Sequence, residues 1–375
     1  MKLKRFLPVA ATAAASALFL SACGGGTSAT GEDTSGSTGG DDAAAEETVS
    51  GTLTGIGASS QKAAMDAWTA GVTSVHPDLQ VQYSPDGSGA GRENFLAGNA
   101  QFAGSDAYLD DEELAAAPEV CGPDGAYEFP VYISPIAIAF NLEGVDSLNM
   151  SAELIAKVFA GEVTNWSDEA IAAENEGVEL PDTPITAVHR SDESGTTENF
   201  TDYLAAAAGD AWGHEAAETW PEEFGGEAAQ GTDGVVSTVS GTDGAIGYAD
   251  ASAVGSLSTV AVGVGEEYVP YSPEAAAAVV DASERVEGRG EGDLALELAR
   301  DTTESGTYPI VLVSYHLVCS TYPDQETVDL VTAWESYVIS EEGQQTAADN
   351  AGSAPISETM RGNIQSVLDT ITVAS

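Results

Sequence analysis

Short apolar runs alternate with longer amphipathic stretches along most of the chain. The apolar runs have the length of strands and are rich in β-branched and aromatic residues: TLTGIGAS (52–59), VYISPIAIAF (131–140), PITAVHR (184–190) and YPIVLVSYHLV (308–318). In four other stretches apolar residues recur every three or four positions, which predicts helices over 59–75, 151–161, 196–209 and 326–340. Strands that alternate with helices indicate an α/β fold.

The first residues differ from this pattern. The basic opening MKLKR precedes an apolar run, Phe6–Leu20, that is short for a membrane span, and small residues then lead to Cys23. This arrangement predicts an export signal over residues 1–22. The stretch LSAC resembles a bacterial lipoprotein cleavage box, which implies that Cys23 carries the lipid, palmitate included, and anchors the protein to the extracytoplasmic face of the cell membrane. The alternative is an ordinary secretory signal with an incidental cysteine.

Residues 23–49 are expected to form a disordered tether. From Gly24 to Glu47 the chain contains Gly, Ser, Thr, Ala and acidic residues but no large apolar side chain. Such a segment cannot bury enough surface to offset its ordering entropy. The roughly 325 residues that follow are enough for two domains with hydrophobic cores.

Charge limits the possible partners. The chain has 61 acidic and 11 basic residues, and removal of residues 1–22 leaves 8 basic residues and a formal charge of −53. We expect no nucleic-acid partner, because this field repels a polyanion. A small anion would also be repelled at long range, so any anion site must depend on local donors and dipoles.

Two cysteines, Cys121 and Cys319, remain after Cys23 is assigned to the anchor. In an exported protein they are expected to form a disulfide, and the alternative is two buried free thiols. Two distant cysteines and four scattered histidines are too few for an obvious metal site, so no metal and no cofactor are expected.

Three clusters of glycine and hydroxyl residues each follow a predicted strand and open a predicted helix: GIGASS (55–60), DGSGAGREN (86–94) and HRSDESGTTENF (189–200). At such junctions unpaired backbone N–H groups and the positive end of the helix dipole can point at an anion. The alternative for each cluster is plain helix capping by Ser or Thr, which is compatible with anion binding.

Basic residues occur in two of these clusters, as Arg92 and Arg190. A guanidinium offers a planar fork of donors that suits an oxyanion and keeps its charge. Arg190 is therefore a candidate ligand group, oriented by Asp192, and the alternative is a surface ion pair with Asp192 or Glu193. Arg92 is expected near the mouth of a cleft, as a supporting or steering charge.

The motifs LTGIGAS, GSGAG, FAGSDAYL, GEVTNWSDEAI, HRSDESGTTENFTDYL and GAIGYAD, in this order, resemble the phosphate-binding protein of the bacterial phosphate ABC importer. The resemblance spans nearly all of residues 50–375. It implies a two-lobed periplasmic-binding-protein fold of type II, with inorganic phosphate bound in the cleft between the lobes. It also implies delivery of phosphate to the permease and ATPase subunits of the importer, by a monomer without enzymatic activity.

Carried over by motif, the ligand groups of the family fall on residues of all three junctions and on the aspartate of FAGSDAYL: Ser59, Ser60, Ser88, Asp106, Arg190, Ser194, Gly195 and Thr196. Three positions depart from the family pattern. Ser60 replaces an aromatic residue, so only its backbone N–H is carried over; Ser59 replaces a threonine; and Glu193 replaces a glycine, with its side chain expected in solvent.

The resemblance also implies lobes that are discontinuous in sequence. We expect 50–132 with 306–375 in lobe one and 133–305 in lobe two, which places Ser59, Ser88 and Asp106 on one wall of the cleft and Arg190 to Thr196 on the other. Closure would then bring both walls onto one phosphate.

Asp106 is expected to select the ligand. A carboxylate repels an anion unless that anion has a proton to donate, and hydrogen phosphate has one whereas sulfate does not. Asp106 is thus expected to accept the P–O–H hydrogen and to exclude sulfate. The alternative is that Asp106 caps the following helix.

Two other functions stay open. Sulfate or molybdate is the first alternative ligand. His189, Asp192 and Ser194 are also the residue types of a nucleophilic hydrolase, so an exported phosphatase is the other alternative, although no G-x-S-x-G motif is present.

Overall fold

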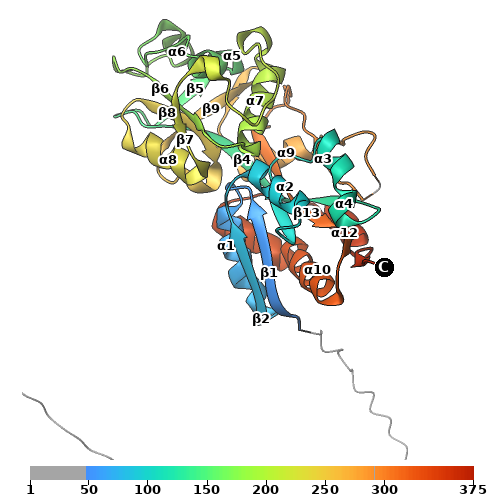
Figure 1. Ribbon diagram of the computed structural model, residues 1–375. Helices are drawn as coiled ribbons and strands as arrows, with labels where there is room; N and C mark the ends of the chain where they lie inside the picture. Colours follow the sequence, from blue (N-terminus) through green and yellow to red (C-terminus); the bar gives the residue numbers. More distant parts are fainter. Residues whose placement is uncertain (1–47, 291) are drawn as a thin grey trace, which may run out of the picture. The chain divides into compact units, whose positions relative to one another are not determined.

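The computed structural model describes residues 48–290 and 292–375, which fold as a mixed α/β structure (Figure 1). The predicted signal peptide, the lipid attachment at Cys23 and nearly all of the predicted tether lie outside the described residues. The predicted α/β class is confirmed.

The first part of the chain and its last part hold one set of elements. These are β1 (Ser50–Gly57), α1 (Lys62–Gly71), a 3₁₀ turn (Val72–Ser74), β2 (Asp78–Ser84), α2 (Ser88–Leu96), β3 (Phe102–Ser105), α3 (Asp111–Ala116), α4 (Pro118–Cys121) and β4 (Ala126–Phe140), then β13 (Val311–Cys319), β14 (Thr321–Tyr322), α10 (Gln325–Ile339), α11 (Glu341–Ala351), α12 (Glu358–Leu368) and β15 (Thr372–Val373).

The middle of the chain holds the others. These are β5 (Ser147–Met150), α5 (Ala152–Phe159), α6 (Glu169–Glu174), β6 (Thr186–Arg190), α7 (Gly195–Ala207), β7 (Glu227–Ala229), α8 (Gly231–Gly241), β8 (Ala245–Asp250), β9 (Ser258–Val264), β10 (Glu267–Val269), α9 (Pro273–Asp281), β11 (Glu284–Arg285) and β12 (Leu296–Glu297), with 3₁₀ turns at Gly209–Ala211, Glu222–Phe224 and Ala251–Ala253.

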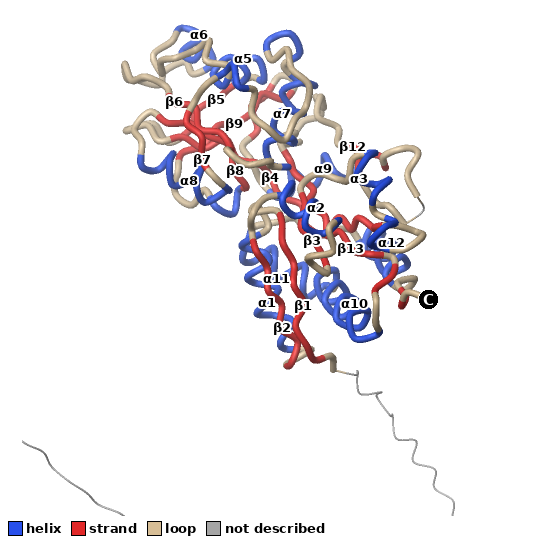
Figure 2. The backbone as a smooth tube through the Cα atoms, in the orientation of Figure 1, coloured by secondary structure: helices blue, strands red, loops and turns tan. Residues whose placement is uncertain are grey.

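One long strand, β4, connects the two sets. The strand order is β2-β1-β3-β13-β4-β8-β6-β7, with β9 also paired to β4, β5 and β10. The first part of β4, up to Pro135, pairs antiparallel with β13, and Ile136–Phe140 pairs antiparallel with β8. The helices α1 and α10 pack beside β1 and β2, and α11 packs on α1 (Figure 2). The division into lobes at residues 132 and 306 stays a prediction.

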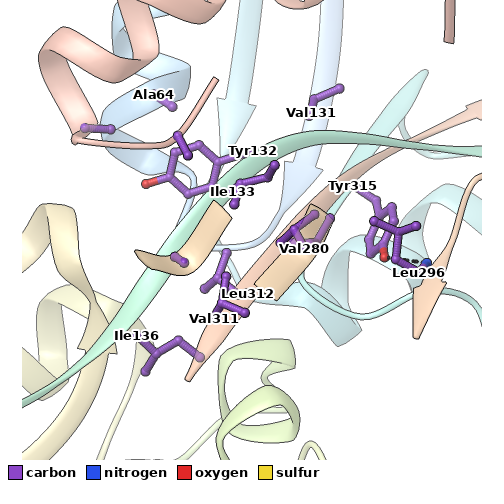
Figure 3. Close-up of a cluster of buried hydrophobic side chains, with 14 of the residues drawn as sticks. Ala64, Val131, Tyr132, Ile133, Ile136, Val280, Leu296, Val311, Leu312 and Tyr315 are labelled. Atoms are coloured by element: carbon purple, nitrogen blue, oxygen red, sulfur yellow. Dashed lines mark hydrogen bonds between the residues drawn. The ribbon is translucent and has the colours of Figure 1, made fainter. Parts of the chain in front are cut away.

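The core lies where β4 and β13 cross the molecule. Tyr132, Ile136 and Leu312 are almost fully buried there (Figure 3). Tyr315 is buried as well, and its hydroxyl oxygen accepts a hydrogen bond of 3.1 Å from the Leu296 N–H group, so its one polar atom is paired.

A β-bulge interrupts the pairing of β4 with β13. Ser314 lies opposite Tyr132, whereas Tyr315 lies opposite Pro130. Pro130 has no N–H group to give to the ladder, which suits it to an irregular position. The apolar pattern predicted β4 only from residue 131, because Glu128 and Pro130 interrupt the apolar run at the start of the strand.

The predicted helices are all present, with ends that differ by a few residues. The predicted helix over 59–75 is α1 followed by a 3₁₀ turn, 151–161 contains α5, 196–209 corresponds to α7, and 326–340 corresponds to α10. The disulfide prediction is also confirmed: Cys121 and Cys319 are joined, with their Cα atoms 4.5 Å apart. Within the described residues, no helix is both long and apolar enough to cross a membrane.

Candidate functional site

The first predicted junction is a tight turn between β1 and α1. Gly57 has φ 149°, and a Cβ atom there would lie 1.9 Å from the Gly104 carbonyl oxygen, so only glycine fits. The next residue, Ala58, donates its N–H to the same oxygen at 2.8 Å. This close approach of β1 to β3 holds Ser59 and Ser60, the following residues, beside the end of β3.

The second junction brings α2 against the third. Gly87, with φ 110°, precedes α2, and its N–H donates to the Gly57 carbonyl at 2.8 Å. A Cβ atom at Gly87 would lie 2.8 Å from Asp192 Oδ2 and 3.8 Å from Arg190 Nη2. The absence of a side chain therefore lets the Arg190 guanidinium lie next to the start of α2, where Ser88 is the first helical residue.

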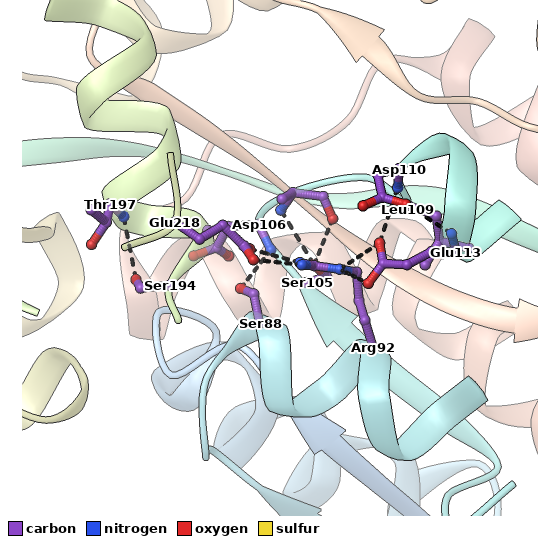
Figure 4. Close-up of polar contacts among 12 residues, drawn as sticks. Ser88, Arg92, Ser105, Asp106, Leu109, Asp110, Glu113, Ser194, Thr197 and Glu218 are labelled. Carbon is purple, nitrogen blue, oxygen red and sulfur yellow. Dashed lines mark hydrogen bonds and ion pairs between the residues drawn. The ribbon is translucent and has the colours of Figure 1, made fainter. Parts of the chain in front are cut away.

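The third junction runs from Arg190, the last residue of β6, to Gly195, the first residue of α7. Ser194 is the N-cap residue of α7: its side chain accepts a hydrogen bond of 3.2 Å from the Thr197 N–H group (Figure 4). The capping interpretation is thus confirmed for Ser194. Glu193 is exposed, as expected.

Asp106 lies where the junctions meet. Its Oδ1 atom accepts hydrogen bonds from Ser60 Oγ at 2.6 Å and Ser314 Oγ at 2.5 Å, and its Oδ2 atom accepts one from Thr196 Oγ1 at 2.8 Å. Its backbone N–H donates to Ser88 Oγ at 3.1 Å (Figure 4). Asp106 does not cap the following helix, because the N-cap of α3 is Asp110.

The first turn of α7 packs directly on Asp106. A Cβ atom at Gly195 would lie 2.8 Å from both the Ala107 nitrogen and the Asp106 Cβ atom. The Asn199 side-chain amide donates to the Asp106 carbonyl at 2.8 Å. A glycine at the start of α7 is therefore required by the fold, independently of any ligand.

Burial dominates the electrostatics of Asp106. Desolvation raises the pKa of this carboxyl, and the hydrogen bonds from Ser314, Ser60 and Thr196, with the charge of Arg190, oppose that rise. The pKa stays above its ordinary value on balance. Asp106 is thus a buried carboxyl whose charge depends on these donors.

Arg190 forms an ion pair, but the pair is buried rather than at the surface. Arg190 is 3% exposed, and its Nε atom donates to Asp192 Oδ1 at 2.9 Å while Nη2 donates to Asp192 Oδ2. Burial raises the pKa of Asp192, but the Arg190 hydrogen bond and charge outweigh it and leave the pKa lowered. Asp192 therefore holds the guanidinium in place, as predicted.

Ser59 contacts a residue that the motifs did not indicate. Its Oγ atom lies 3.1 Å from Thr232 Oγ1 and accepts a hydrogen bond of 3.1 Å from the Thr232 N–H group, at the start of α8. The preceding Gly231 N–H donates to Asp192 Oδ1 at 3.0 Å. The start of α8 thus connects Ser59 with the Arg190–Asp192 pair.

Arg92 is not a steering charge, and that part of the prediction is wrong. The residue is 7% exposed, its Nε atom donates to Glu113, and Nη1 and Nη2 donate to the two oxygens of Glu218 at 2.7 and 2.6 Å (Figure 4). Burial opposes its charge, but the two carboxylates raise the pKa above the ordinary value. Arg92 also donates to Ser105, the residue before Asp106, so it helps to position Asp106 without facing the ligand site itself.

The residues that suggested a hydrolase, His189, Asp192 and Ser194, do not form a hydrogen-bonded catalytic triad in the described part of the chain. His189 stacks on Trp220 with ring centroids 5.1 Å apart, and its Nδ1 atom lies 2.9 Å from the Arg190 carbonyl. Among the described residues there is no hydrogen bond between His189 and Ser194. Nor do those residues contain a group of three His, Cys, Asp or Glu side chains suited to a metal ion.

Comparisons with known proteins identify the family. A family model described as a PBP superfamily domain matches residues 42–342. The phosphate-binding protein PstS2 of Mycobacterium bovis is 34% identical over 379 residues, which covers 99% of this chain and 100% of that protein. The phosphate-binding protein PstS 3 of Mycobacterium leprae is 36% identical over 85% of this chain and 87% of its own length. The chain belongs to the PstS family.

Solved structures agree with the predicted fold. A high-affinity periplasmic phosphate-binding protein (PfluDING), solved with phosphate bound, superposes with a TM-score of 0.69 at 22% identity, over 84% of this chain and 93% of its own. An ancestral soluble variant of the human phosphate-binding protein gives a TM-score of 0.67 at 20% identity, with the same coverage. The predicted two-lobed PstS fold is confirmed.

The structure gathers all of the predicted PstS site residues and adds others. Ser59, Ser60, Ser88, Asp106, Arg190, Ser194, Gly195 and Thr196 are all buried around the three junctions. The additional contacts come from Gln61, Asn199, Thr232 and Ser314. Ser314 had a signal in the sequence: it and His316 are polar residues two positions apart in the apolar run YPIVLVSYHLV, which places them on one face of a strand.

Proposed function

We propose that this protein captures inorganic phosphate outside the cytoplasm and delivers it to the permease and ATPase subunits of an ABC importer. The observation that carries the proposal is Asp106, a buried carboxyl that accepts hydrogen bonds from three hydroxyl groups next to a buried arginine. A carboxylate in this setting suits an anion that brings its own proton. Membership of the PstS family supports the same ligand.

In the proposed site the ligand groups fall into two classes. Arg190 supplies the permanent charge, and it is held by Asp192 so that little side-chain entropy is lost on binding. The hydroxyl groups of Ser59, Ser88 and Ser194, and the backbone N–H groups of Ser60, Gly195 and Thr196, supply neutral donors at helix starts. The Ser194 N–H group is not among them, because it donates to the Glu218 carbonyl at 3.1 Å. Asp106 accepts the hydrogen of the ligand.

We also propose that the site is formed by two lobes, residues 50–132 with 306–375 and residues 133–305, that close on the ligand. Several contacts cross this boundary: Thr196 with Asp106, Thr232 with Ser59, and Glu218 with Arg92. Because β4 runs through the boundary, we place a hinge of this motion in its backbone, at the change of partner from β13 to β8.

The test of the proposed function is equilibrium dialysis with labelled phosphate. We expect saturable binding that arsenate competes for and that excess sulfate or molybdate leaves unchanged. Release of inorganic phosphate from a phosphate ester should stay at the level of a blank. Preferential binding of sulfate or molybdate, or turnover of the ester, would replace the proposal by the corresponding alternative.

For localisation, we propose that residues 1–22 are removed and that lipid on Cys23 anchors the protein, as a monomer, to the outer face of the cell membrane. Support comes from the LSAC motif and the polar segment behind it. Radiolabelled palmitate should be incorporated by the parent protein and not by a Cys23→Ala variant, and the variant should appear in the medium. Equal labelling of the two proteins would contradict the anchor.

The Arg92–Glu218 ion pair is expected to favour the closed arrangement of the proposed lobes. Glu218→Gln should weaken phosphate binding about threefold to tenfold, because the charge that crosses the boundary is lost while Arg92 keeps Glu113. Glu113→Gln is the matched control: it changes the same guanidinium within one lobe and leaves the capping box of α3 usable. Titration calorimetry measures both. Equal losses in the two variants would assign the pair to stability rather than closure.

A further inference from the structure

A row of buried polar side chains leads from α10 to Asp106 through the apolar interior. Glu335 contacts His316 Nδ1 at 2.9 Å, and His316 Nε2 lies 3.1 Å from Gln61 Oε1. Gln61 Nε2 donates to Ser314 Oγ at 2.6 Å, and Ser314 Oγ donates to Asp106 Oδ1 at 2.5 Å. Each of these side chains is almost fully buried. Buried polar groups are costly unless paired, and here each one is paired with the next.

The hydrogen bonds in this row run in one direction. The Gln61 amide nitrogen also faces the Tyr315 carbonyl at 3.3 Å, and a carbonyl can only accept, so the nitrogen and not the oxygen lies on that side. The Gln61 oxygen therefore faces His316, and His316 Nε2 must carry a hydrogen. The Ser314 oxygen accepts from Gln61, so its own hydrogen is left for Asp106.

At the end of the row farthest from Asp106, Glu335 determines where the His316 ring carries its hydrogens. Because Nε2 carries a hydrogen, a proton also lies between His316 Nδ1 and the Glu335 carboxyl, whichever of the two groups holds it. The ring is also packed between Phe102 and Trp334, whose ring centroids lie 5.2 and 6.3 Å from that of His316, and these contacts favour its present orientation. The packing of the core therefore determines which groups in the row donate and which accept.

We propose that Glu335, His316 and Gln61 are positioning residues for ligand selection, because they force the Ser314 hydroxyl to donate to Asp106. This inference rests on the proposed phosphate site. Donors from Ser60, Ser314 and Thr196 occupy three of the roughly four acceptor positions of a carboxylate. One acceptor position on Oδ2 is left for the proton of hydrogen phosphate, and an oxyanion without a proton is repelled.

Other groups around Asp106 set the pH range of this selection. Arg190 favours the ionised carboxyl, whereas Asp250 and Tyr83 lie near enough to interact with it electrostatically. Loss of the Ser314 donor removes the largest contribution that opposes burial, so the pKa of Asp106 should rise further. A protonated Asp106 is a donor, so sulfate should then begin to bind at a higher pH than in the parent.

The main experiment compares Gln61→Glu with Ser314→Ala. In Gln61→Glu the new carboxylate cannot donate, so the Ser314 hydroxyl turns toward it and away from Asp106. Both variants should reduce the ratio of sulfate to phosphate dissociation constants about tenfold or more, and both should shift its pH profile upward. The double variant should reduce the ratio of dissociation constants no further than either single variant does, because both changes remove the same hydrogen bond.

Gln344→Glu is the matched control. Gln344 is also a buried amide, but it bonds only to backbone groups of Val131, Val338 and Ile356. This variant should lower the unfolding temperature without changing the ratio of dissociation constants. If folded Gln61→Glu keeps the parent ratio and pH profile, the positioning role is wrong.

A spectroscopic measurement on the parent does not depend on whether the variants fold. The chain has four histidines, so their ¹⁵N NMR signals can be assigned by substitution of the other three. We expect hydrogen on Nε2 of His316, and a bare Nε2 would contradict the inference. Failure of the parent to bind phosphate would instead contradict the proposed function, so the two outcomes are separate.

Discussion

Arg190→Ala is expected to weaken phosphate binding by roughly 2–4 kcal/mol, which is a loss of about thirtyfold to a thousandfold. Arg190 is buried and held by both oxygens of Asp192, so its charge is already desolvated and oriented before the ligand arrives. Its removal takes away the permanent positive charge of the site and leaves the Asp192 carboxylate without its cation near the anion. Titration calorimetry with phosphate measures the loss.

Arg361→Ala is the control for the loss of a basic residue. Arg361 pairs at the surface with Glu341, whose side chain is 90% exposed, and a pair of this kind contributes little. We expect parent-like phosphate binding in this variant. An Arg190→Ala protein that is folded and binds like the Arg361→Ala protein would show that Arg190 only stabilises the third junction.

The second large effect concerns Asp106. Asp106→Ala should lose roughly 2–4 kcal/mol of phosphate binding, because the acceptor for the ligand's proton disappears and the hydroxyl groups of Ser60, Ser314 and Thr196 lose their partner. Asp106→Asn should lose less, since its oxygen can keep Ser60 and Ser314 while its amide nitrogen faces Thr196.

Selectivity separates these two variants further. The parent should discriminate against sulfate by about a hundredfold or more, and Asp106→Asn should lose most of this, because its NH₂ group can face an oxyanion that has no proton. Arsenate, which carries a proton near neutral pH, should compete in both proteins. If Asp106→Asn gains no sulfate binding and loses phosphate as severely as Asp106→Ala, Asp106 has a structural role.

Much of the site could be predicted because its chemistry is local in sequence. Each junction consists of a strand, a short turn and a helix start, so the residues that face the turn are contiguous, as Ser59 and Ser60 or Ser194 to Thr196 are. The steering role of Arg92 was predicted wrongly because its partners, Glu113 and Glu218, are separated from it by 21 and 126 residues. A charge in a short motif does not reveal whether distant acids already neutralise it.

The contacts that the sequence did not predict also join residues that are far apart in the chain. Gln61 meets Ser314 across 253 residues and Ser59 meets Thr232 across 173 residues, so only the folded sheet brings them together. The β-bulge between Ser314 and Tyr315 was also invisible, because it depends on the proline that lies opposite it in β4. Sequence patterns predicted the residues of the candidate site, whereas the contacts that support these residues depend on tertiary packing.

The disulfide also determines how the protein responds to a cut in its backbone. Cys121 and Cys319 are 198 residues apart, and every element from β4 to β12 lies between them. Glu222 and Glu223 are exposed in this interval, so a glutamate-specific protease can reach them. A single cut there produces two polypeptides that stay covalently joined, which migrate as one band on a denaturing gel and separate only after reduction. The fragments therefore cannot diffuse apart without reduction, and a nicked molecule keeps the residues of the proposed ligand site in one covalent unit.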